Sequence, residues 1–159
     1  PRPCMHCEKP ACLAACPVGA IKKTPDGIVY VNYAACKGVR ACIPACPYEV
    51  PNFDDGGYFT DDTPAVQAYE KAAAYEMGTK LARNKDGKAP MGRMRKCTYC
   101  FHRLQSGTLP ACATTCIGHA TFFGDLNDAD SLIFELSGSP RMRRLKESAG
   151  TKPTTFYLV

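Results

Sequence analysis

Hydrophobic residues occur in short runs separated by turn-forming residues, and thirteen glycines and thirteen prolines punctuate the 159-residue chain. The pattern therefore predicts short elements joined by turns. The clearest pair of runs, 20–23 and 28–31, flanks the turn sequence Pro25-Asp26-Gly27 and predicts a β-hairpin. Alternate residues of its second strand would then face opposite sides of the hairpin.

Other stretches favour short helices. Residues 10–16 predict a helical turn that begins near Pro10 and ends at Pro17. The longest helical pattern, over 65–77, follows a Thr63-Pro64 start signal and stops at Gly78. The remaining predictions are a short helix and a Gly107 turn within 101–111, a strand end and turn over 122–125, a helix over 129–136, and a β-prone tail over 154–159 that pairs with a sheet edge or docks on a partner.

These elements predict an α+β fold: a ferredoxin-like repeat of short helices and β-hairpins, with a mostly helical insertion. The absence of tryptophan and an aromatic content of 9% indicate a modest apolar core, so bound cofactors would have to help hold the fold. The predicted divisions are a two-cluster module at 1–53, the insertion at 54–92, a third cluster motif at 93–124 and a C-terminal docking segment at 125–159.

The cysteine pattern gives the strongest indication of function. The chain has 11 cysteines, and their repeated Cys-x-x-Cys spacing favours metal binding over a secreted disulfide framework. The first group, with spacing C-x2-C-x4-C-x3-C-P, is formed by Cys4, Cys7, Cys12, Cys16 and Pro17.

The second group repeats that pattern with one ligand missing. Cys36, Cys42, Cys46 and Pro47 fall on the C-x2-C-x2-C-x3-C-P pattern of bacterial ferredoxins, but Val39 stands where the second cysteine is expected. A valine side chain has no donor atom, so a cluster here lacks one protein ligand.

In paired motifs of this kind the fourth cysteine ligates the other cluster. Three thiolates and an empty corner at Val39 favour a [3Fe-4S] cluster in the second site. A four-iron cluster completed by hydroxide or an outside ligand is an alternative, and plain buried cysteines are another. The predicted ligands are Cys4, Cys7, Cys12 and Cys46 for a [4Fe-4S] cluster, and Cys16, Cys36 and Cys42 for the [3Fe-4S] cluster.

A third group, formed by Cys97, Cys100, Cys112 and Cys116, has a long x11 gap and Ile117 in place of the usual proline. It predicts a further [4Fe-4S] cluster, with zinc as a weaker alternative. Three basic residues precede it, Arg93, Arg95 and Lys96. We expect them to balance the cluster charge or to contact a partner, and the alternative is a solvated face. The histidines, His6, His102 and His119, are expected in supporting or surface roles rather than as ligands.

The formal net charge of +5 raises the question of nucleic acid as a partner. Three clusters of roughly −2 each would bring the total to about −1, and no nucleic-acid motif accompanies the charge, so the basic excess is interpreted as charge compensation and a docking surface. No apolar run approaches the length of a membrane span, and there is no signal peptide pattern. Because the chain begins at Pro1 just before a ligand motif, further sequence upstream is expected.

The three groups resemble motifs two, three and four of the four-cluster electron-transfer subunit of complex iron–sulfur molybdoenzymes. That family includes dimethyl sulfoxide, nitrate, polysulfide, thiosulfate and tetrathionate reductases and alternative complex III. The resemblance covers nearly the whole chain. It rests on Cys4-Met-His-Cys7-Glu-Lys-Pro-Ala-Cys12, on Cys46-Pro-Tyr48, on Lys96-Cys97-Thr-Tyr-Cys100 and Pro110-Ala-Cys112-Ala-Thr-Thr-Cys116, and on Phe122-Phe-Gly-Asp-Leu-Asn-Asp128 and Gly150-Thr-Lys-Pro with Phe156-Tyr-Leu158.

The family's first motif is absent from this sequence, and in the family it pairs with the fourth. The resemblance therefore implies that Cys97, Cys100 and Cys112 share a cluster with a cysteine outside the sequence, while Cys116 serves another cluster. The alternative is that all four close one cluster. In nitrate reductase-type members the position of Val39 also lacks cysteine, a [3Fe-4S] cluster occupies the site, and it lies at the membrane end of the relay beside a haem or quinone.

The resemblance implies an electron-transfer subunit without an active site of its own, peripheral to a bacterial respiratory membrane. Its partners would be a catalytic molybdopterin-type subunit and a membrane anchor subunit, with the quinone pool reached indirectly. Two alternatives remain: a free-standing soluble polyferredoxin that carries electrons by diffusion, and a zinc-stabilised interaction module.

Overall fold

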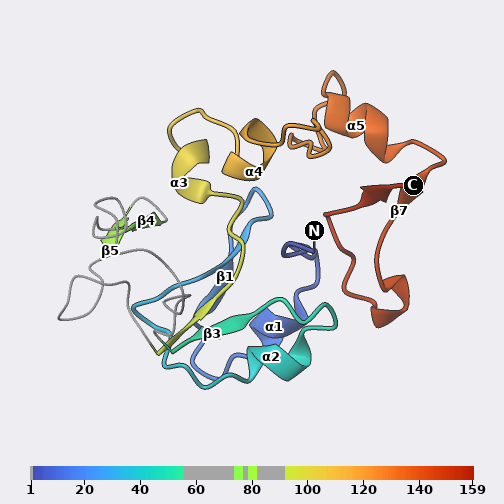
Figure 1. Cartoon of the computed structure of the whole chain (residues 1–159). Coiled ribbons are helices and arrows are strands. Elements are labelled where there is room, and N and C mark those ends of the chain that lie inside the picture. Colours follow the sequence, from blue (N-terminus) through green and yellow to red (C-terminus); the bar gives the residue numbers. More distant parts are fainter. Residues whose placement is uncertain (1, 56–73, 77–78, 82–91) are drawn as a thin grey trace, which may run out of the picture.

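The computed structural model describes residues 2–55, 74–76, 79–81 and 92–159. Within them the chain forms short helices and two-stranded antiparallel sheets (Figure 1). The helices are α1 (Ala11–Ala14), α2 (Cys42–Ala45), α3 (Phe101–Leu104), α4 (Ala111–Thr114), α5 (Leu132–Ser137) and the 3-10 helix η2 (Glu147–Ala149). The strands are β1 (Ile21–Lys23), β2 (Val29–Val31), β3 (Asn52–Asp54), β4 (Ala74–Glu76), β5 (Thr79–Leu81), β6 (Arg93–Arg95), β7 (Met142–Arg143) and β8 (Tyr157–Leu158).

The predicted hairpin is confirmed as β1 and β2, which pair antiparallel with Ile21 opposite Val31. Val29 and Val31 face inward and are almost completely buried, whereas Tyr30 between them is only partly covered. This alternation follows from the two-residue period of a strand. The inward face forms the main apolar core together with Tyr33 and the two ligand loops described below.

The two halves of the cysteine repeat have the same local structure. The first contains α1 with Pro10 at its N-cap, as predicted, and the second contains α2. The two helices lie side by side below the β1–β2 hairpin (Figure 1). The described helices have no more than six residues, so packing and ligand binding rather than helix propensity must hold them in place.

A sheet between distant segments joins the repeat to the third cysteine group. Strand β3 pairs antiparallel with β6, which places Phe53 opposite Met94. Since β6 runs directly into Cys97, this pairing sets the position of the third ligand loop against the first two. Sequence patterning did not predict this sheet, because neither three-residue strand has a distinctive alternation.

The C-terminal tail pairs as a strand, which confirms the prediction of edge pairing. Strand β8 lies antiparallel to β7, with Arg143 opposite Tyr157. Before reaching β8, residues 151–155 run alongside the first ligand loop and form backbone hydrogen bonds to it, among them Lys9 N–H to the Thr151 carbonyl (3.0 Å) and Thr154 N–H to the Met5 carbonyl (2.9 Å).

Three local predictions need correction. Most of the helix predicted over 65–77 lies outside the described residues, and its described part, Ala74–Glu76, is strand β4 paired with β5. Residues 122–125 form no strand, because no described segment pairs with them. The helix predicted over 129–136 begins later, at Leu132, because the Ser131 hydroxyl caps it by accepting the Phe134 N–H (3.1 Å).

Among the described residues, no helix is long and apolar enough to cross a membrane. The division of the chain at residues 53, 92 and 124 stays a prediction.

Candidate iron–sulfur sites

All three ligand loops bend in the same way after their first cysteine. The residue two positions later has a left-handed backbone in each: His6 (φ 41°), Gly38 (φ 68°) and Tyr99 (φ 53°). In the first and third loops this bend directs a backbone N–H at the ligand sulfur, from His6 to Cys4 and from Tyr99 to Cys97, both at 3.5 Å. Histidine and tyrosine rarely adopt this conformation, so the surroundings must enforce it.

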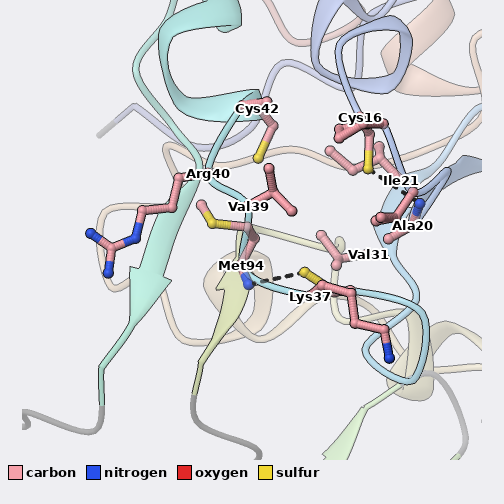
Figure 2. Close-up of a pocket in the computed structure, with 13 residues that line it drawn as sticks. Cys16, Ala20, Ile21, Val31, Lys37, Val39, Arg40, Cys42 and Met94 are labelled. Atoms are coloured by element: carbon pink, nitrogen blue, oxygen red, sulfur yellow. Dashed lines mark hydrogen bonds between the residues drawn. The ribbon is translucent and has the colours of Figure 1, made fainter.

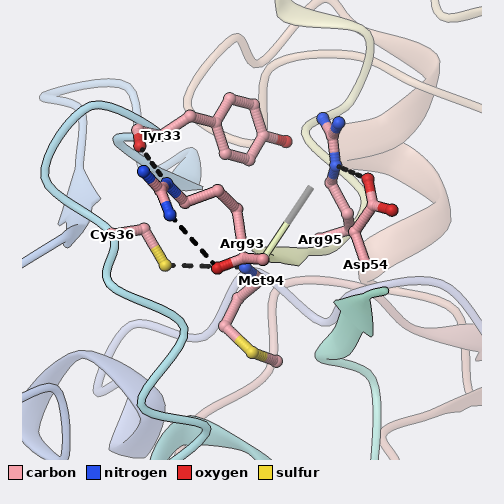
Figure 3. A network of polar contacts seen from close by, with 7 residues as sticks. Tyr33, Cys36, Asp54, Arg93, Met94 and Arg95 are labelled. Atoms are coloured by element: carbon pink, nitrogen blue, oxygen red, sulfur yellow. Dashed lines mark hydrogen bonds and ion pairs between the residues drawn. The ribbon is translucent and has the colours of Figure 1, made fainter. Parts of the chain in front are cut away.

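The second loop reaches the same bend with a glycine, and only glycine fits there. A Cβ on Gly38 would collide with the Gly92 carbonyl oxygen and approach a Phe53 ring carbon to 2.9 Å. The N–H that reaches the Cys36 sulfur (3.5 Å) comes from Met94 on strand β6 instead (Figure 3). The second loop is therefore packed directly against the sheet that leads to the third cysteine group.

The last cysteine of each group also begins a shared backbone turn. In each turn the N–H three residues after the cysteine donates to the cysteine carbonyl, at 3.0 or 3.1 Å, and the donor residue has a positive φ. The three pairs are Cys16 with Gly19, Cys46 with Glu49, and Cys116 with His119. The turn after Cys116 thus forms with Ile117 in place of proline.

In the first and third of these turns a second N–H bonds to the sulfur itself, from Ala20 to Cys16 (3.2 Å) and from Ala120 to Cys116 (3.3 Å). Burial acts to raise the pKa of the Cys16 thiol, but backbone N–H groups outweigh it and lower the pKa. The Ala120 N–H likewise lowers the pKa of the Cys116 thiol. Both turns thus favour the thiolate, which is the form that binds iron.

Three of the predicted ligands of the first cluster act electrostatically on the fourth, Cys12. Burial, together with negative charge on Cys4, Cys46 and Cys7, raises the pKa of the Cys12 thiol to about 12, although the Lys96 ammonium acts to lower it. Cys46 comes from the second motif, so charge from that motif acts on a thiol of the first. The exchange of fourth cysteines between the two motifs stays a prediction.

The predicted second site is a cavity lined by Cys16, Cys36, Cys42 and Val39 (Figure 2). Burial raises the pKa of the Cys42 thiol, and so does charge on Cys16 and Cys36. In Figure 2 the Cys16 and Cys42 sulfurs and the Val39 side chain face the same space. Val39 is 54% exposed, so the corner without a cysteine lies at the protein surface.

The third group is less enclosed than the other two. Cys112 is exposed, and Cys97, Cys100 and Cys116 are partly covered. Burial raises the pKa of the Cys97 thiol, with a contribution from charge on Cys4. The strongest influences on the Cys116 thiol are backbone groups of its own turn. In the described residues, Cys97 of the third group is thus influenced by the first site, and Cys112 is the exposed cysteine of the group.

The basic residues before the third group are bonded inside the protein and do not form a solvated face. Arg93 Nε donates to the Tyr33 carbonyl (3.0 Å), and Arg95 Nε forms an ion pair with Asp54 Oδ2 (3.0 Å) (Figure 3). Lys96 Nζ donates to the Val29 carbonyl and to the Cys97 carbonyl (2.8 Å). Lys96 therefore places a positive charge between the first and third ligand loops.

The His6 side chain contacts both the hairpin and the third ligand loop. Its side chain is 1% exposed, and its Nδ1 accepts the Val29 N–H (3.0 Å), which leaves the proton on Nε2. Its ring stacks on Tyr99 at 3.7 Å between ring centroids. Burial, together with the Lys96 charge, lowers the pKa of His6 to about 2, so the ring is neutral.

Sequence reasoning missed the threonines of the C-terminal segment. Thr155 Oγ1 donates to the Cys4 carbonyl (3.1 Å) and also contacts the Tyr99 hydroxyl (2.5 Å). Thr154 Oγ1 donates to the His6 carbonyl (2.9 Å). No sequence pattern indicates these contacts, because about 150 residues separate the threonines from the loop around Cys4 and His6.

The donor set fits iron–sulfur clusters. All eleven cysteines are free thiols, and backbone N–H groups point at the sulfurs of Cys4, Cys16, Cys36, Cys97 and Cys116. Thiolate ligands with amide hydrogen bonds are the usual surroundings of such clusters.

A protein-family model described as a 4Fe-4S dicluster domain matches residues 1–62 and 80–126. The chain belongs to the 4Fe-4S dicluster domain family. This membership makes [4Fe-4S] clusters its cofactors, and the short helices and β-hairpins are those of a ferredoxin-like dicluster fold.

The chain is similar over 99% of its length to subunits of several reductases, among them the following three. A selenate reductase subunit of Mesobacillus selenatarsenatis is 52% identical, and 54% of its own length is covered. A tetrathionate reductase subunit of Salmonella typhimurium is 34% identical, with 50% covered. The arsenate respiratory reductase iron-sulfur subunit of a Shewanella species is 32% identical, with 74% covered. The chain spans about half the length of the first two.

Proposed function

We propose that this chain is the electron-transfer part of an iron–sulfur subunit in a molybdopterin-type respiratory reductase complex. Bound clusters supply one-electron transfer with little change of shape. The observation that carries the proposal is the set of three similarly bent cysteine loops on a chain matched over 99% of its length by reductase subunits. The partners would be a catalytic molybdopterin-type subunit and a membrane quinone or haem subunit.

The proposed ligand sets follow the spacing of the cysteine motifs. Cys4, Cys7, Cys12 and Cys46 hold one [4Fe-4S] cluster, and the buried thiols of this set influence one another's charge. Cys97, Cys100, Cys112 and Cys116 supply ligands for the third site. The exposure of Cys112 is compatible with either four ligands to one cluster or a ligand from outside this sequence.

For the second site we propose a [3Fe-4S] cluster held by Cys16, Cys36 and Cys42. Support comes from the cavity that these three thiols line with Val39. One thiolate fewer removes negative charge beside the cluster, which raises its reduction potential relative to a four-iron site. A high potential and a surface position suit exchange with a quinone or haem subunit at a bacterial respiratory membrane.

A free-standing polyferredoxin is the second candidate, and exposed apolar side chains disfavour it. Ile117 is 98% exposed beside the third group, and Leu109, Phe122, Leu132 and Phe134 are each about half exposed nearby in the sequence. Exposed apolar groups of this kind are common at protein–protein interfaces. A relay subunit should therefore co-purify with larger partners, whereas a diffusing carrier should elute alone.

The test is purification from the native organism followed by low-temperature EPR of the oxidised complex, with iron and sulfide counted on the same sample. We expect larger partner subunits, and a three-iron signal that disappears on reduction and becomes a four-iron signal in Val39→Cys. Elution as a lone chain would overturn the relay function. Iron without the three-iron signal would overturn the second-site assignment, and zinc without iron would overturn both.

A further inference from the structure

Two buried hydroxyl groups meet beside the first ligand site. The Tyr48 hydroxyl lies 2.6 Å from Thr151 Oγ1, and the two residues are 2% and 5% exposed. Tyr48 follows the Cys46-Pro47 pair, whereas Thr151 belongs to the C-terminal segment, 103 positions away. Hydroxyls buried this deeply need hydrogen-bond partners, because an unpaired buried polar group destabilises the fold.

Thr151 is held in this position by the backbone on both sides of it. Its carbonyl accepts the Lys9 N–H (3.0 Å), and the next carbonyl, of Lys152, accepts the Glu8 N–H (2.8 Å). These bonds align the C-terminal segment with the residues that directly follow Cys7. Cys7 in turn packs in one buried cluster with Tyr48. The threonine and the tyrosine therefore approach the same ligand from different parts of the chain.

The two hydroxyls together have one hydrogen more than the bond between them uses. Each hydroxyl has one hydrogen, and the bond between Tyr48 and Thr151 uses one of the two, whichever residue donates it. The other hydrogen remains for a further acceptor. Tyr48 packs against Cys7 in the buried cluster. Burial raises the pKa of the Cys7 thiol, and the Thr151 side chain acts to lower it. As a thiolate ligand, the Cys7 sulfur can only accept.

We propose that Tyr48 and Thr151 form a two-hydroxyl donor to the Cys7 sulfur that raises the reduction potential of the first cluster. The proposal rests on the proposed assignment of Cys7 as a ligand of that cluster. A donor to sulfur stabilises the reduced cluster more than the oxidised one, because the reduced cluster carries more negative charge. The C-terminal segment thereby acts on the redox properties of a site near the other end of the sequence.

The experiment is a potentiometric EPR titration of the intact complex carrying Thr151→Val, Tyr48→Phe or both changes. Each change removes a hydroxyl and nearly preserves shape. The first cluster's signal is identified as the one that Cys7→Ala abolishes. We expect Thr151→Val to shift that signal's midpoint to a more negative potential and to leave the other clusters and the iron content unchanged. Tyr48→Phe should shift it in the same direction, because the two-hydroxyl donor needs both groups in place.

The double variant separates a shared donor from general packing. If the two hydroxyls form one chain, the shift in the double variant will be smaller than the sum of the single shifts. Thr154→Val is the matched control, since its hydroxyl donates to backbone carbonyls of the same loop and to no sulfur. It should leave the potential unchanged.

An unchanged potential in Thr151→Val at full iron content would overturn the proposal and leave the relay function standing. An equal shift in Thr154→Val would also overturn it, because the effect would then come from loop packing. If Cys7→Ala abolished no cluster signal, the ligand assignment itself would be wrong.

Discussion

The first and third ligand loops share a backbone but differ in their surroundings. Both bend through a left-handed residue, and both direct an N–H at the first cysteine sulfur at 3.5 Å. Cys4 and Cys7 are nevertheless buried, whereas Cys112 is exposed. The comparison teaches that the motif determines the shape of a ligand loop, while the rest of the chain determines how far that loop is shielded from water.

The C-terminal segment accounts for the difference. Its backbone and its threonines donate to the Cys4, Met5 and His6 carbonyls, so it covers the first loop along its length. The segment contacts the third loop at Tyr99, whose hydroxyl lies 2.5 Å from the Thr155 hydroxyl. Burial at the first site excludes water from its cluster, and the openness of the third leaves it free for contact with another polypeptide.

We expect the largest difference between the first and third loops when one cysteine ligand is removed from each. We expect Cys7→Ala and Cys112→Ala each to lose about four iron atoms. Cys7→Ala should also destabilise the fold by about 3 kcal/mol or more, because the buried cluster contributes directly to folding. Cys112→Ala should leave stability nearly unchanged. Iron analysis and thermal unfolding measure both, and equal melting temperatures in the two variants would contradict the expected difference.

Acid should affect the first loop through His6. The pKa of His6 is about 2 in the folded protein and 6.5 in the unfolded chain, so only the unfolded chain binds this proton between those values. The free energy of unfolding should therefore fall as the pH drops below about 6.5, by up to about 1.4 kcal/mol per pH unit. His6→Gln should reduce this slope, measured by denaturant unfolding between about pH 7 and pH 5.

His119→Gln is the matched control in the third group, because His119 is exposed in the turn after Cys116. It should leave the slope as in the unmodified protein. A His6→Gln protein with an unaltered slope would mean that another group controls the acid sensitivity.

We expect the smallest change in stability from removing a single threonine hydroxyl that donates to a backbone carbonyl. One such hydroxyl lies at each loop. The Thr155 hydroxyl donates to the Cys4 carbonyl in the first loop (3.1 Å). The Thr108 hydroxyl donates to the Arg103 carbonyl after the third loop (2.9 Å). Because the Thr108 bond is exposed to water, Thr108→Val should cost little. Thr155→Val should destabilise the protein by about 1 kcal/mol. Chemical denaturation would distinguish the two, and equal losses would argue against a special role for the C-terminal segment.

Much of the local structure was predictable from short patterns. The β1–β2 hairpin follows from two apolar runs around Pro25-Asp26-Gly27, and α1 follows from Pro10 and Pro17 at its two ends. The start of α5 was misplaced, because a serine cap inside the expected helix decides it. Strand β6 was missed, since its sequence reads only as a basic stretch before Cys97.

The sequence alone determined the cysteine groups, their spacing and the missing ligand at Val39, because these are properties of neighbouring residues. It also indicated that Cys46 and Cys16 are exchanged between the two motifs, through the rule for paired ferredoxin motifs.

Only the tertiary structure decided which loops are buried and what touches the ligands. The pairing of β3 with β6, the Met94 N–H on Cys36 and the Tyr48–Thr151 pair beside Cys7 all join segments that are far apart in the chain. Such contacts form where distant segments meet as the chain folds, and no local pattern of residues specifies them. The spacing of cysteines therefore defines where clusters bind, and the contacts between distant segments define the environment that tunes them.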